Sequence, residues 1–230
     1  MMLWNEDAGI MKHVPHDKYN VAWFTLAECI ARGERVRALG VYRLLSHSIN
    51  NTAFAKQLEG DIMLAFQDKD AALVKYKEAA DLYQKEGKLL EAVAVYEHMR
   101  DIDSNKFEYL DRIVELYTVL RIESKVTANL KLLFEEYVHK HEFDAAQETL
   151  VLLDNVLEPK YTACLHQQIS FALLQNPEHD TAQVKAHIKA AVLGFIQSDD
   201  NRALQKFLSS LEIINKEYAC DAYQIAGKDN

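Results

Sequence analysis

The chain has 230 residues, of which 49% are hydrophobic, and carries a formal net charge of −9 at pH 7. This acidic balance, without a cluster of Lys and Arg, argues against nucleic acid and anionic membrane surfaces as partners, because both need concentrated positive charge. No apolar run reaches membrane-spanning length, and Met1–Ile10 is acidic where a secretion signal is basic, so the sequence predicts a cytoplasmic protein without membrane insertion.

Glycine, proline and cysteine usage narrows the fold class. Seven Gly and three Pro leave little material for long loops, which favours an all-α protein. The three cysteines, Cys29, Cys164 and Cys220, lie far apart in apolar helical contexts. We therefore expect three buried free thiols, as is usual in a reducing compartment.

The first twenty residues form a predicted arm. Met1–Asn20 contains Pro15 and shows no clear helical period. Its apolar residues, Trp4 among them, are unusual for a disordered tail. Two interpretations stay open: the arm covers the end of a helical stack, or it docks on another protein with Trp4 as the candidate contact. Residues 21–226 are predicted to form one solenoid domain, and residues 227–230 a frayed tail.

Helical periodicity follows the arm almost without interruption, and predicts about 11–12 helices. Gly40, inside the second of them, is expected to mark a close helix crossing. The predicted helices lie near residues 20–32, 35–47, 52–66, 70–86, 88–102, 107–120, 124–140, 160–174, 180–197 and 200–214, with one more between 141 and 159 and a final piece ending near Tyr223.

The stretch Asp70–Asn105 organises the rest of the chain. Apolar residues recur every three or four positions on both sides of Gly87, which indicates an amphipathic helical hairpin. Small side chains at Ala79, Ala80 and Ala92 let two helices approach closely, with tyrosines filling the space beside them. A hairpin cannot bury both of its faces alone, so it needs neighbours of the same kind.

This hairpin resembles the tetratricopeptide repeat, a helix pair of about 34 residues with small and aromatic residues at fixed offsets. Ser104 stands where the family usually has proline, and Gly60 is the expected small contact of the preceding copy. The residues that carry the resemblance are Tyr83, Gly87, Ala92, Tyr96 and Asp103.

Equivalent packing positions recur at alternating spacings. Ala72 precedes Ala92 by 20 residues and Ala92 precedes Val126 by 34, which gives a period of 54 and three helices per period. A further copy follows if Ala146 matches Ala203, with a loop expanded by about three residues. This phrasing also resembles soluble NSF attachment proteins. The resemblance implies a right-handed superhelix of antiparallel helices, similar to tetratricopeptide solenoids.

Motifs for catalysis, cofactors or metals are not found in the sequence. His139 and His141 are two residues apart and point to opposite sides of a helix, while Glu135 and His139 supply only two ligands. No glycine-rich phosphate loop or nucleophile elbow occurs. We expect no catalytic residue, no metal and no cofactor.

The resemblance also implies a groove lined by one helix of each pair. Asp81 stands where some tetratricopeptide proteins use asparagine to hold a carboxylate, so the groove favours a basic or amphipathic protein segment. From the family's inner-face offsets, the candidate residues are Lys77, Asp81, Gln84, Asp111, Glu115 and Thr118.

Three functions remain open at this stage. The first is a non-enzymatic adaptor, scaffold or chaperone that binds a protein segment on its concave face. The second is a structural subunit of a larger assembly, docked through the N-terminal arm and the C-terminal helix. The third, more remote, is an enzyme whose site is not recognisable in sequence. The sequence sets neither the partner nor the oligomeric state.

Overall fold

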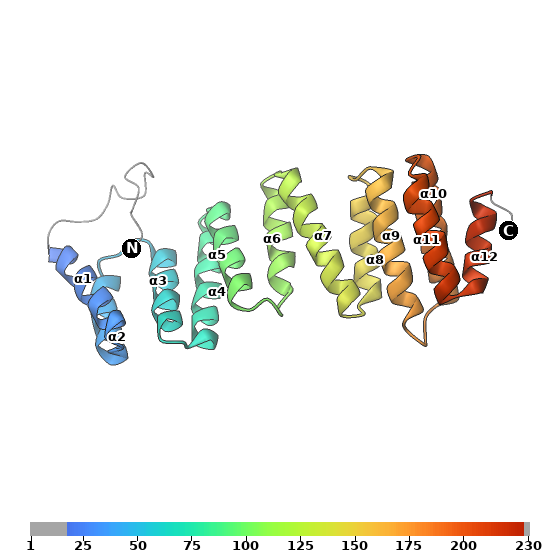
Figure 1. Cartoon of the computed structure of the whole chain (residues 1–230). Coiled ribbons are helices and arrows are strands. Elements are labelled where there is room, and N and C mark those ends of the chain that lie inside the picture. The colour runs from blue at the N-terminus through green and yellow to red at the C-terminus, as the bar shows by residue number, and fades with distance from the viewer. Residues whose placement is uncertain (1–17, 228–230) are drawn as a thin grey trace. The chain divides into compact units, whose positions relative to one another are not determined.

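A computed structural model describes residues 18–227, with side chains described from residue 21 onward. In this range the chain forms twelve α-helices and no strand (Figure 1), so the all-α prediction is confirmed. The helices are α1 (Lys18–Ala31), α2 (Arg35–Ser46), α3 (Thr52–Ala65), α4 (Lys69–Lys85), α5 (Leu89–Ile102), α6 (Glu108–Val119), α7 (Glu123–His139), α8 (Phe143–Asp154), α9 (Pro159–Leu174), α10 (Thr181–Gln197), α11 (Asn201–Ile214) and α12 (Lys216–Ile225).

The contacts divide the chain into two compact units. The first extends to Leu116 and the second begins at Tyr117, so α6 starts in one unit and ends in the other. A single solenoid domain over residues 21–226 stays a prediction. The predicted arm contact Trp4 lies outside the described residues.

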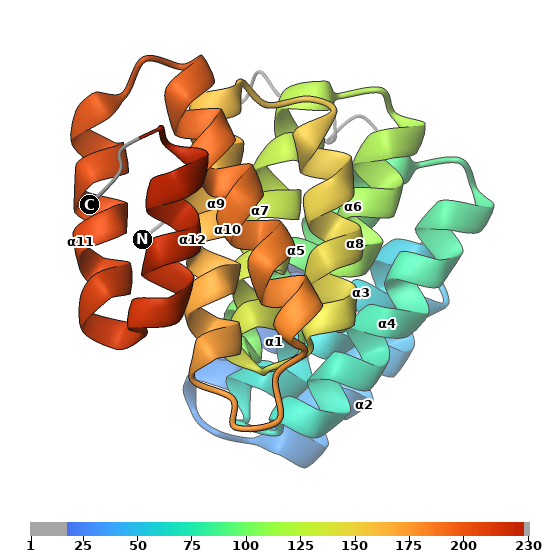
Figure 2. The ribbon, with the colours of Figure 1, turned by 90° about the vertical axis from the view of Figure 1, so that its right-hand side faces the viewer.

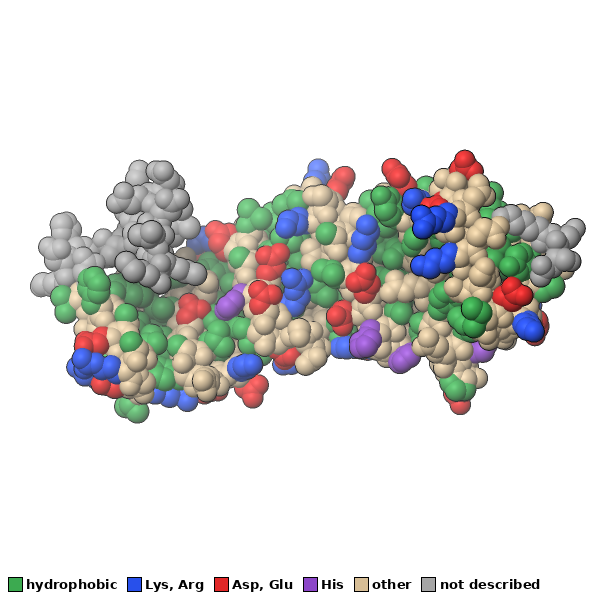
Figure 3. Space-filling model, viewed as in Figure 1, with side chains coloured by type: hydrophobic (Ala, Val, Ile, Leu, Met, Phe, Trp, Pro, Cys, Tyr) green, Lys and Arg blue, Asp and Glu red, His purple; other side chains and the backbone are tan. Residues whose placement is uncertain are grey.

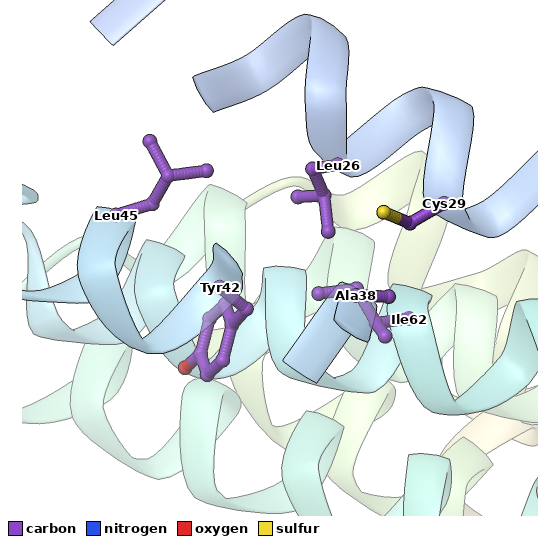
Figure 4. Packing of buried hydrophobic residues seen from close by; sticks show 6 residues of the cluster. All are labelled: Leu26, Cys29, Ala38, Tyr42, Leu45 and Ile62. Atoms are coloured by element: carbon purple, nitrogen blue, oxygen red, sulfur yellow. The ribbon is translucent and has the colours of Figure 1, made fainter. Parts of the chain in front are cut away.

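In the first unit, α1 packs on α2, α2 on α3, α3 on α4 and α4 on α5. Figure 4 shows the cluster where α1, α2 and α3 meet. Tyr42 reaches across it, and its hydroxyl donates to the Ala55 carbonyl at 2.9 Å. The labelled side chains of this cluster are Leu26, Cys29, Ala38, Tyr42, Leu45 and Ile62.

The α4–α5 hairpin has the core that the sequence predicted. Ala79, Ala80 and Ala92 are fully buried, and the tyrosines beside them are almost completely buried. Gly60 of α3 lies against Tyr76 of α4, since a Cβ added at Gly60 would lie 2.8 Å from the Tyr76 ring. The expected small contact at Gly60 is therefore confirmed.

Two expectations about small residues were wrong. Gly40 lies in open space, with nothing within 4 Å of an added Cβ, so it marks no helix crossing. Cys164 and Cys220 are exposed, and only Cys29 is buried. The reason is helical phase: Ala163 and Ala219 face the core, which turns the residue after each of them toward solvent.

The 54-residue period is visible in the buried positions. Ala92 of α5 and Ala146 of α8 are both fully buried (146 − 92 = 54). The next copy is shifted, because in α11 the equivalent buried residue is Leu204 (204 − 146 = 58), and the predicted match, Ala203, is only half-buried. The loop expansion is therefore four residues and not three.

Most of the tight turns between helices use a residue with positive φ. In such turns the chain closes by a hydrogen bond over six residues, as from the Lys88 N–H to the Tyr83 carbonyl at 2.9 Å. Glycine takes this conformation easily, while other residues are strained in it. The helix-to-helix turn residues with positive φ are Gly33, Gln67, Gly87, Arg121, His141 and Asp199.

In the second unit, α9 and α10 make the closest approach. A Cβ added at Gly194 would lie 2.8 Å from the Ala163 Cβ, so only glycine fits at this crossing. Helix α12 packs on both α10 and α11 (Figure 2). No helix in residues 18–227 has both the length and the apolar character needed to cross a bilayer.

Candidate protein-binding surface

One side of α4 carries an ordered row of polar residues. Lys77, Asp81 and Gln84 lie on successive turns, beside the face that α4 buries. The Lys77 ammonium pairs with the Asp81 carboxylate at 2.5 Å, and both side chains are about half exposed, at 48% and 43%. The sequence predicted all three as groove residues; the structure places them together on one side of α4, and their role in a groove stays a prediction.

Tyr96 of α5 holds this row in place. Its side chain is 1% exposed, and its hydroxyl accepts a hydrogen bond from the Gln84 amide at 3.3 Å. Its ring lies 6.0 Å from the Lys77 ammonium, within cation–π range. One buried tyrosine therefore orders the exposed Lys77 and the half-buried Gln84. The sequence indicated Tyr96 only as a core residue.

The charge on Lys77 is stabilised by these neighbours. Partial burial opposes the charged form, but Asp81 and Tyr96 outweigh it and raise the pKa of the ammonium above its ordinary value. Lys77 therefore stays charged at neutral pH.

Helix α6 adds a second ion pair to the first unit. The Arg112 guanidinium pairs with Glu115 at 2.7 Å, three residues further along the helix. Glu115 raises the pKa of Arg112, and Tyr96 and Asp81 add smaller contributions, so Arg112 lies within the electrostatic reach of α4 and α5. Arg112 was not among the predicted groove residues, although its spacing from Glu115 is a readable helical ion-pair signal.

The other two predicted residues also lie on α6. Asp111 is half-buried in the first unit, one turn before Glu115. Thr118 belongs to the second unit, so its place in the groove stays a prediction. We call the set Lys77, Asp81, Gln84, Tyr96, Asp111, Arg112 and Glu115 the α4–α6 surface.

The α4–α6 surface is mixed in charge. Asp81 and Glu115, which the sequence offered as acids for a basic partner, each already pair with a cation on their own helix. On the face in Figure 3, acidic and basic side chains are interspersed in the same way. A surface of this kind suits a partner that also carries both charges.

A separate polar cluster joins three helices of the second unit. His166 of α9 bonds through Nε2 to Asp154 of α8 at 3.2 Å, and through Nδ1 to Nδ1 of His187 of α10 at 2.9 Å. Burial, then the charge of His166, lowers the pKa of His187 from 6.5 to about 4. Burial also lowers the pKa of His166, against the opposing effect of Asp154.

Both histidines of this cluster are therefore neutral near pH 7. An Nδ1–H on His187 then donates to His166, whose Nε2–H donates to the Asp154 carboxylate. Among the residues that the structure describes, no group of three or more His, Cys, Asp or Glu side chains is placed to hold a metal ion.

Comparison with known proteins gives a distant likeness in structure. No protein-family model matches the chain, and no curated protein matches it in sequence. It is similar to the solved structure of the C-terminal part of a TPR repeat-containing protein from Cytophaga hutchinsonii, at 11% identity and a TM-score of 0.32. The alignment covers 90% of this chain and 93% of that chain. A TM-score this low does not assign the chain to a family, so membership of the tetratricopeptide family stays a prediction.

Proposed function

We propose that this protein is a non-enzymatic interaction module, an adaptor, scaffold or chaperone of the cytoplasm, that binds a segment of another protein on the α4–α6 surface. The observation that carries the proposal is the double role of Tyr96, which is buried itself and orders both Gln84 and Lys77 at the exposed side of α4.

Such ordering favours binding. A long side chain that is already fixed loses less rotamer freedom when a partner arrives, and this loss costs about 0.5–1.5 kcal/mol for each side chain that must be immobilised. Lys77 and Gln84 are held before any partner is present. They are therefore better suited to recognition than freely rotating surface residues.

The ion pairs of the surface favour an amphipathic partner over a purely basic one. Exposed pairs such as Lys77–Asp81 and Arg112–Glu115 contribute only about 0–1 kcal/mol to folding. A partner that brings both a cation and an anion can exchange with them at small cost. A partner with cations alone would leave Lys77 and Arg112 facing like charges.

Selection from a displayed peptide library on the immobilised full chain tests the proposal. We expect enrichment of amphipathic sequences with residues of both charges, weakened as salt is raised. Reversing Asp81, Asp111 and Glu115 to Lys should abolish that enrichment. A matched control reverses Glu135, Glu148 and Glu212, which are exposed on α7, α8 and α11, and changes the net charge equally. If the two triple variants select the same peptides as the parent, binding occurs elsewhere and the proposal fails.

A further inference from the structure

A pocket of about 430 Å³ lies between α10 and α12 in the second unit. Figure 2 shows these two helices side by side. Ile188 and Ile225 line the pocket together with the ring of Tyr218, so its floor is apolar. This volume falls in the range of ligand pockets in proteins, and is large enough for an aromatic side chain.

The walls of the pocket are fixed by interactions on several sides. Tyr218 is 5% exposed, and its hydroxyl lies 3.3 Å from Nε2 of His179. Nδ1 of His179 in turn donates to the Asn176 carbonyl at 2.8 Å. Lys185 of α10 pairs with Asp221 of α12 at 2.9 Å and joins the two helices across the pocket. These hydrogen bonds and this ion pair therefore hold the walls of the pocket in place.

Two polar side chains at the pocket have no internal partner. Lys189 and Gln224 are exposed and line the pocket, and neither side chain makes a hydrogen bond or ion pair within residues 21–227. Asp221 is neutralised by its ion pair with Lys185, and the charge of Glu217 also raises the pKa of Lys185. The charge left for a ligand in the lining is thus that of the Lys189 ammonium. The pocket suits an apolar group with a carboxylate and an amide close beside it.

The segment Met1–Ile10 of the same sequence has this chemistry. Leu3 and Trp4 are followed within three residues by the acids Glu6 and Asp7, and Asn5 lies between them. A tryptophan side chain gives the largest apolar contact of any residue, and an adjacent carboxylate complements Lys189.

We propose that the α10–α12 pocket of one copy binds the Met1–Ile10 segment of a second copy, with Trp4 on the apolar floor and Glu6 or Asp7 paired with Lys189. The contact joins two different surfaces, so each copy offers one segment and one pocket. Such head-to-tail contacts build assemblies that grow with concentration. This inference does not depend on the α4–α6 surface. It makes specific the hypothesis that the protein is a structural subunit docked through its N-terminal arm and its C-terminal helix.

Sedimentation of the full chain over a range of concentrations tests this assembly. The average mass of the parent should rise with concentration and fall again as salt is raised. Trp4→Ala and Lys189→Glu should each weaken association about tenfold or more, while Lys206→Glu on α11 leaves it unchanged. Circular dichroism melts of all variants establish that each is folded.

Three further experiments distinguish this contact from other modes of association. Combining Glu6→Lys and Asp7→Lys with Lys189→Glu reverses the charge on both sides and should restore association. A mixture of the Trp4→Ala and Lys189→Glu proteins has one intact segment and one intact pocket, and should stop at dimers. A synthetic Met1–Ile10 peptide in excess should dissociate the parent.

Three results would each overturn the proposal. The first is that the parent stays monomeric at every concentration, as it would also do if the segment bound to the pocket of its own chain. Association persists in both single variants, which would place the contact on another surface. The peptide fails to compete with the parent's self-association.

Discussion

Replacing Gly60 by alanine probes the contact between α3 and α4 directly. An alanine Cβ would lie 2.8 Å from Cε1, 2.9 Å from Cδ1 and 3.1 Å from Cζ of the Tyr76 ring. Carbon atoms in contact normally stay about 3.5–4.0 Å apart, so the ring would have to retreat by several tenths of an ångström.

The Tyr76 ring has little freedom to retreat. It is fully buried, and its hydroxyl donates to Asp61 at 2.6 Å. The same oxygen lies 3.2 Å from Nε2 of His98, which then acts as the donor, and the two rings meet edge to face. Movement of the ring therefore strains two hydrogen bonds as well as the packing.

The expected cost of Gly60→Ala follows from these terms. Overpacking costs about 1–3 kcal/mol, and a weakened hydrogen bond about 1 kcal/mol more. Removing a helical glycine returns about 1 kcal/mol. We expect a net loss of about 1–3 kcal/mol in the free energy of unfolding. Gly40→Ala, with nothing within 4 Å of its new Cβ, should instead gain up to about 1 kcal/mol.

Urea denaturation followed by circular dichroism compares the two variants within the same unit. A Tyr76→Leu background supplies a second test, because without the ring the cost of Gly60→Ala should shrink markedly. Equal stabilities of the Gly60→Ala and Gly40→Ala proteins would refute the close α3–α4 contact.

Three other predictions concern stability. The pKa of His187 falls from 6.5 to about 4 on folding, so as the pH is lowered the unfolded chain binds the proton before the folded chain does. The free energy of unfolding should therefore be highest above pH 6.5 and should decrease between pH 6.5 and about 4, by up to about 3 kcal/mol. Urea midpoints at several pH values should show this decline, and His187→Gln should flatten it. Ala92→Leu should lose about 1–3 kcal/mol because Ala92 is fully buried, whereas the exposed Ala94→Leu in the same helix should melt like the parent. Gln67→Gly should gain up to about 1 kcal/mol by relieving its positive φ, while Ala94→Gly, inside α5, should lose about 1 kcal/mol; a loss at Gln67 would contradict the strained turn.

Helix positions and the main core could be predicted because they depend on local periodicity. Buried alanines at 79, 80 and 92 were identified from spacing alone, since each helix packs on its sequence neighbours and the repeat supplies independent copies. The shift in the last copy could not be found in this way. Leu204 takes the place of a small alanine there, and an alanine one residue earlier gave a false match.

The candidate site was predictable only in part. Spacing by one helical turn placed Lys77 beside Asp81. The role of Tyr96 was not readable, because a buried aromatic at helical spacing looks the same whether or not its hydroxyl reaches the surface. The pocket between α10 and α12 was missed for a similar reason: no periodicity specifies where two helices leave space between them.

The packing of each helix on its sequence neighbours has a consequence for how the chain folds during synthesis. Within the first unit, α1 to α5 are joined by short turns and contact one another in chain order. Closing such short loops costs little entropy, so folding should be fast. The residues up to Leu116 contain all of these contacts. A nascent chain that has emerged to about this point already has what it needs to complete α1–α5 before the second unit has emerged.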